Sequence, residues 1–116
     1  MFRIKRIYEP SAETDGFRVL VDRIWPRGMT KEAAAIDLWL KEVAPSTDLR
    51  KWFGHEASRW AAFKDRYRAE LETPEPAAAL ETLHRVETEH EVVTILFGAR
   101  DETRNQAVAL LEILNE

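Results

Sequence analysis

The chain of 116 residues contains no cysteine and only four glycines, and its wholly apolar runs are only a few residues long. The absence of cysteine excludes disulfides, a thiolate nucleophile and a cysteine-ligated zinc site. Such short apolar runs exclude a bilayer-spanning helix, because that helix needs about 20 apolar residues. The sequence also lacks a Walker motif, a dinucleotide-binding fingerprint and a GxSxG nucleophile elbow. The classes of protein built on these motifs are therefore disfavoured.

The composition is that of an ordinary globular protein, with 45% hydrophobic and 33% charged residues. The length fits one compact domain over residues 1–116. The N-terminus enters a strand-like pattern at once and has no apolar core of a signal peptide. These features predict a cytoplasmic protein that makes no contact with a membrane.

Charge is distributed unevenly along the chain, whose formal net charge is −4. Residues 1–31 carry seven Lys/Arg against four Asp/Glu, whereas residues 69–91 carry seven Glu against one Arg. An acidic chain is a poor non-specific ligand for nucleic acid, since that binding depends on neutralising many phosphates. Arginine outnumbers lysine twelve to five, which suits bidentate recognition of anions but is also what a GC-rich coding bias would produce.

Hydrophobic periodicity predicts strands, then helices, then a last strand and helix. Strands are expected at residues 2–8, 17–22 and 92–97, and helices at 30–33, 46–54, 56–72, 77–89 and 103–114. Residues 36–40 form either a third strand or the end of the first helix. This order favours an α/β fold with a layered, mostly parallel sheet covered by helices, in a Rossmann-like or flavodoxin-like arrangement. It leaves open whether the first two strands pair directly.

Two loops follow predicted strands, and parallel α/β sheets bind ligands at the carboxyl ends of their strands. One loop runs from Asp22 to Gly28 and the other from Gly98 to Asn105. If their strands are adjacent and parallel, both loops open on the same edge. The predicted ligand-binding residues are Arg23, Trp25, Arg27, Gly28, Arg100, Arg104 and Asn105.

These residue types favour an anionic, partly planar small molecule, such as a nucleotide or phosphorylated metabolite. Arginine offers forked donors and tryptophan offers a stacking face. Asp22 is the candidate general base if the protein is an enzyme, or it orients an arginine. The alternative is structural: the same side chains close a turn and cover one end of the sheet. No metal or cofactor is expected, because the three histidines lack ligand spacing.

The element Asp-Arg-x-Trp-Pro-Arg-Gly at residues 22–28 is highly specific and resembles the YeaO-like branch of a bacterial and archaeal family described as a domain of unknown function. The resemblance continues through Trp-Phe-Gly-His at 52–55 and Asn-Gln-Ala at 105–107. It implies a small cytoplasmic α/β protein and no established activity. It also makes His55 a second candidate proton-transfer group. Relatives often have Asn-His-Ala at the last motif, and Gln106 cannot replace a histidine as acid or base.

Two other classes of function remain open from the sequence. In the first, the protein is a nucleic-acid-binding accessory protein whose basic N-terminal region and aromatic residues contact a single strand. In the second, it is a protein-interaction module in which the acidic region 70–91 binds a basic partner. The sequence does not select an oligomeric state.

Overall fold

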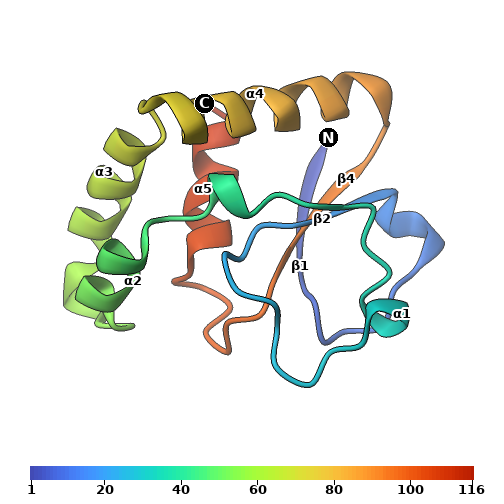
Figure 1. Cartoon of the computed structure of the whole chain (residues 1–116), viewed down its shortest axis with the longest axis horizontal. Helices are drawn as coiled ribbons and strands as arrows, with labels where there is room; N and C mark the ends of the chain where they lie inside the picture. The colour runs from blue at the N-terminus through green and yellow to red at the C-terminus, as the bar shows by residue number, and fades with distance from the viewer.

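A parallel sheet sets the architecture of the protein (Figure 1). The computed structural model describes residues 1–116, with strands β1 (Phe2–Arg6), β2 (Phe17–Leu20), β3 (Leu38–Trp39) and β4 (Val93–Phe97). Their order is β1-β4-β2-β3, and each neighbouring pair is parallel. The predicted α/β class with a layered, parallel sheet is therefore confirmed. The first two strands do not pair, because β4 lies between them, and the ambiguous segment 36–40 contains a short strand.

Five α-helices connect the strands and cover the sheet. They are α1 (Lys31–Ala34), α2 (Thr47–Phe53), α3 (Trp60–Glu70), α4 (Pro74–Glu89) and α5 (Gln106–Leu114). Short 3-10 turns occupy Glu13–Asp15, Lys41–Val43 and Ala57–Arg59. None of the helices combines the length and the apolar character that a membrane crossing would need.

The starts of α3 and α4 differ from the prediction by three or four residues, and that of α5, which borders the site, differs by three. Helix α4 begins at Pro74 rather than at residue 77, because proline suits the first turn, where its missing N–H has no intrahelical acceptor. Helix α3 begins at Trp60 rather than at residue 56, because a 3-10 turn with tighter hydrogen bonding comes first. These differences concern helix ends, where local hydrogen bonding outweighs hydrophobic periodicity.

Both faces of the central strands are buried, because successive side chains of a strand point to opposite faces. Val19 and Ile95 belong to the main core, which the sheet shares with α2, α3, α4 and α5. Leu20 and Leu96 belong to a smaller cluster on the other face, which α1 covers. The continuous apolar runs of β2 and β4 thus reflect strands buried on both faces.

A buried ion cluster fixes the connection between β1, β2 and α1. Arg18 is 4% exposed and donates to the carboxylate of Asp15 and to the backbone carbonyl of Ala34. Lys5 donates to the same carboxylate at 3.1 Å. Burial alone would raise the pKa of Asp15, but hydrogen bonds from the Ala12 amide and from both cations hold that pKa below its usual value. Two basic side chains of the N-terminal region are therefore engaged inside the fold.

Candidate functional site

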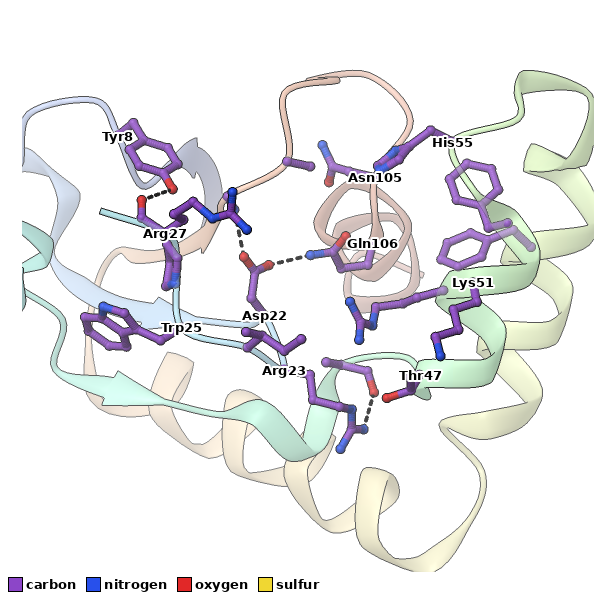
Figure 2. A pocket seen from close by; sticks show the side chains of 18 residues that line it. Tyr8, Asp22, Arg23, Trp25, Arg27, Thr47, Lys51, His55, Asn105 and Gln106 are labelled. Carbon is purple, nitrogen blue, oxygen red and sulfur yellow. Dashed lines mark hydrogen bonds between the residues drawn. The ribbon is translucent and has the colours of Figure 1, made fainter. Parts of the chain in front are cut away.

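The carboxyl ends of β2 and β4 lie next to each other, because these strands pair in parallel from Phe17 with Val93 to Leu20 with Leu96. The β2 loop (residues 21–28) and the β4 loop (residues 98–105) therefore open on the same edge of the sheet. A cavity of about 670 Å³ lies there, within the size range of small-molecule sites. In Figure 2 the β2 loop and α2 form facing walls, and the start of α5 lies between them.

Six of the nine residues predicted from the sequence line this cavity. They are Asp22, Arg23, Trp25, Arg27, His55 and Asn105. Arg100 and Arg104 are exposed on the β4 loop but do not line the cavity, and neither does Gly28, which has a φ of 76° in its turn. A role for these three in ligand binding stays a prediction.

Asp22 lies between the two walls and joins the two loops (Figure 2). Its Oδ2 accepts a hydrogen bond from the Gly98 amide at 2.9 Å, and its Oδ1 accepts one from Nε2 of Gln106. Burial raises the pKa of Asp22 to about 6, although both hydrogen bonds and the positive charge of Arg50 act in the opposite direction. Two hydrogen bonds thus fix the carboxyl group, and its pKa lies above the ordinary value of an aspartate.

Gln106, which the sequence marks only as a departure from the YeaO-like pattern, contacts Asp22 directly. A primary amide donates this hydrogen bond but does not exchange protons as an imidazole does. The residue at this position therefore determines what chemistry is available to Asp22. In this chain the pair consists of a carboxyl group and an amide.

Arg23 and Trp25 shape the wall on the β2 side. Arg23 donates to the carbonyl oxygens of Ala44 at 3.0 Å and Pro45 at 3.3 Å, which ties the β2 loop to the segment before α2. The Trp25 indole donates to the carbonyl of Met29 at 2.7 Å and closes the turn. These contacts give both residues a structural role, which the sequence left as an alternative to ligand binding.

Arg27 differs from its neighbours because its guanidinium is in no hydrogen bond or ion pair of the chain. Only its backbone carbonyl is engaged, by the hydroxyl of Tyr8 at 2.7 Å. The side chain lies on the cavity wall opposite α2 (Figure 2). It is a cation available to a ligand.

Helix α2 supplies two cations that the sequence analysis missed. Ser46 caps this helix by accepting from the Leu49 amide at 3.1 Å, and Thr47, Arg50 and Lys51 then line the cavity at helical i, i+3 and i+4 spacing. The Nε of Arg50 is buried and has no hydrogen-bond partner. In the sequence, the signal for this wall is the polar face of the helix, which carries Thr47, Arg50 and Lys51 at helical spacing.

His55 lines the cavity just after α2 and has a φ of 60°, which is uncommon for a residue with a side chain. Gly54 before it also has a positive φ, of 51°. The two residues end the helix and turn the imidazole to within 6.0 Å of the Phe53 ring, measured between centroids. Such backbone strain often occurs at functional positions.

Asn105 is 1% exposed, and its polar atoms are used by the fold. Its Oδ1 caps α5 by accepting from the Val108 amide at 2.9 Å, and its Nδ2 donates to the carbonyl of Asp101 at 2.8 Å. The Asp101 carboxylate accepts from the amides of Thr103 and Arg104. This turn makes α5 begin at residue 106 rather than at the predicted 103. No group of three or more His, Asp or Glu side chains has the arrangement of a metal site.

Comparison with known proteins gives consistent matches over nearly the whole chain. The model of a family described as the inactive DUF488-N3 subclade matches residues 1–116. Uncharacterized protein YeaO of Escherichia coli is 41% identical over 95% of this chain and 93% of its own length. Uncharacterized proteins Mb3100c of Mycobacterium bovis and Rv3073c of Mycobacterium tuberculosis are each 42% identical over 97% of this chain and 92% of theirs. No solved structure matches. The chain therefore belongs to the family described as the inactive DUF488-N3 subclade and is a YeaO-like protein.

Proposed function

We propose that the protein binds an anionic small molecule, such as a nucleotide or a phosphorylated metabolite, in the cavity between the β2 loop and α2. The observation that carries this proposal is the set of unpaired cations: Arg27, Arg50 and Lys51 line the cavity and form no ion pair within the chain. A buried donor without a partner costs about 1–3 kcal/mol. The Nε of Arg50 is such a donor, and an oxyanion would satisfy it.

The rest of the lining supports an organic ligand rather than a bare ion. Phe53 and Phe63 stack with their ring centroids 4.5 Å apart at the α2 side, and Ile24, which is 63% exposed, lies at the β2 side. Small-molecule sites combine such apolar surface with a few polar groups that fix orientation. The ligand then places its charge near Arg50 and its apolar body against these side chains.

Binding without turnover is the form of this function that we favour. The matching family is described as inactive, and the group against Asp22 is the amide of Gln106. A general acid–base pair needs two groups that exchange protons near neutral pH. His55 stays a candidate for proton transfer only with a substrate placed between it and Asp22.

The two alternatives from the sequence gain no support from the fold. A single-strand binder needs several free cations, and two of those in the N-terminal region, Lys5 and Arg18, are held by Asp15. The acidic region 70–91 borders a second cavity through Glu89, His90 and Glu91, but Arg3 lines that cavity too, so its surface is not uniformly acidic. We therefore propose neither function.

A ligand screen by thermal shift tests the proposal, with Arg50→Gln as the test variant and Arg85→Gln as its control. Arg85 is exposed on α4 and outside the cavity. The screen compares nucleotides and sugar phosphates with the corresponding nucleosides and sugars, which carry no charge. A bound anion at a hundred times its Kd adds about 2.7 kcal/mol, which raises Tm by several degrees. Arg50→Gln should weaken binding about tenfold or more, because a charged hydrogen bond is lost.

The control defines the result that would contradict the proposal. If Arg85→Gln weakens binding as much as Arg50→Gln, the anion binds elsewhere on the surface. If no anionic compound raises Tm more than its uncharged counterpart, the cavity is not an anion site.

A further inference from the structure

One carboxylate lies among the cations of the cavity, and it is the feature that a simple anion site does not explain. The titratable or charged groups that line the cavity with Asp22 are Tyr8 after β1, Arg23 and Arg27 of the β2 loop, Arg50 and Lys51 of α2, and His55 after α2. Helix α5 contributes the amides of Asn105 and Gln106, and the β4 loop contributes Gly98 and Ala99. An anion that enters therefore meets one like charge, fixed by hydrogen bonds to two elements.

The geometry of Asp22 restricts what can lie beside it. Each carboxylate oxygen already accepts one hydrogen bond, from the Gly98 amide or from Gln106, and each has a further lone pair. The two bonds prevent the carboxylate from turning away. An oxyanion without a hydrogen brings a second acceptor and a second negative charge to these lone pairs. An oxyanion with its own O–H donates to them instead.

We propose that Asp22 makes the cavity selective for oxyanions that carry their own hydroxyl hydrogen, as hydrogen phosphate does, over those that carry none, as sulfate does. This inference rests on the proposed function and narrows it: a phosphorylated metabolite fits best while its phosphate keeps a proton, which a phosphomonoester loses above about pH 6. Asp22 is then a specificity-determining residue that accepts a hydrogen bond from the ligand. A site built to accept such a bond discriminates strongly against an analogue that lacks the donor.

The selectivity depends on pH, because a protonated Asp22 donates a hydrogen bond to either anion. Burial raises the pKa of Asp22 to about 6, so the side chain is ionised at pH 8 and largely protonated at pH 5. His55 also lines the cavity, so the test includes a variant of this residue.

Isothermal titration of the full chain at constant ionic strength tests the proposal with three probes: inorganic phosphate, sulfate and methyl phosphate. At pH 8 the wild type should bind phosphate at least about tenfold more tightly than sulfate, because one charged hydrogen bond replaces one repulsion. Methyl phosphate should behave as sulfate does, since a phosphomonoester has lost its last proton above about pH 6. At pH 5 the preference should shrink to about threefold or less, because Asp22 is then largely protonated and phosphate is a monoanion while sulfate stays a dianion.

Two variants identify the residue responsible. Asp22→Asn should bind phosphate and sulfate with similar affinity at pH 8, where both are dianions, because no fixed negative charge remains. His55→Asn should keep the preference at pH 8, and asparagine also tolerates the left-handed backbone at this position.

Each contrary result has one meaning. Equal binding of phosphate and sulfate by the wild type at pH 8 would overturn the selectivity and leave the proposed anion site standing. A preference that persists in Asp22→Asn, or disappears in His55→Asn, would remove the role assigned to Asp22. If none of the three anions binds at either pH, both this inference and the proposed function fail.

Discussion

Replacing Asp22 by asparagine should stabilise the protein at pH 8 and have little effect at pH 4. The carboxyl pKa is raised by burial from 3.8 to about 6 in the folded chain. Below pH 3.8 the group is protonated in both the folded and the unfolded state and costs nothing. As pH rises towards 6 the unfolded chain releases its proton first, so the free energy of unfolding decreases. Above pH 6 the free energy of unfolding is lower by about 3 kcal/mol, which is the energy equivalent of the difference between the two pKa values.

Asparagine carries no charge, so the variant avoids this cost. We expect a gain of about 2–3 kcal/mol at pH 8, less what the new amide loses in hydrogen bonding, and less than about 1 kcal/mol at pH 4. Urea unfolding followed by circular dichroism at both pH values measures the difference. Asp65→Asn, at an exposed position of α3, is the matched control and should change little at either pH. The reasoning is refuted if Asp22→Asn lowers the free energy of unfolding at pH 8, because the hydrogen bonds of the carboxylate would then outweigh the cost of its burial.

Two further substitutions test the backbone around the site and the sheet. His55→Gly removes the side chain from a residue with a φ of 60°, so it should raise the free energy of unfolding by about 1 kcal/mol. It should also weaken phosphate binding, and thermal shift with and without phosphate measures both effects. A variant that loses both stability and affinity would contradict this prediction. Gly16→Ala adds a Cβ that would overlap the carbonyl of Val92 at a φ of 63°, and it should cost more than about 2 kcal/mol in urea unfolding. Gly28→Ala has open space at a φ of 76° and should cost only about 1 kcal/mol, so equal losses at the two glycines would count against the overlap.

The sequence was sufficient to predict those features that depend on residues close together along the chain. Alternation and β-branched residues located β1, β2 and β4, and the Asp-Arg-x-Trp-Pro-Arg-Gly element located the β2 loop at the end of a buried strand. The same rule of parallel sheets brought the β2 and β4 loops to one edge. Helix starts were less secure, since the turn held by Asp101 and the first-turn prolines of α4 act through hydrogen bonds that periodicity does not record.

The sequence did not predict that α2 forms the other wall of the cavity. Arg50 and Lys51 line the cavity with the β2 loop, and Arg23 joins that loop to the segment before α2 across more than twenty residues. The contact of Gln106 with Asp22 spans 84 residues and exists because β4 inserts between β1 and β2.

By itself, then, the sequence determined the α/β class, the strands β1, β2 and β4 and the loops that follow β2 and β4, because each depends on near neighbours along the chain. The tertiary structure decided which cations stay unpaired and which carboxyl group is buried among them. Those properties depend on burial and on partners distant in sequence. The order of the strands and the docking of α2 against the β2 loop bring these distant residues to one cavity.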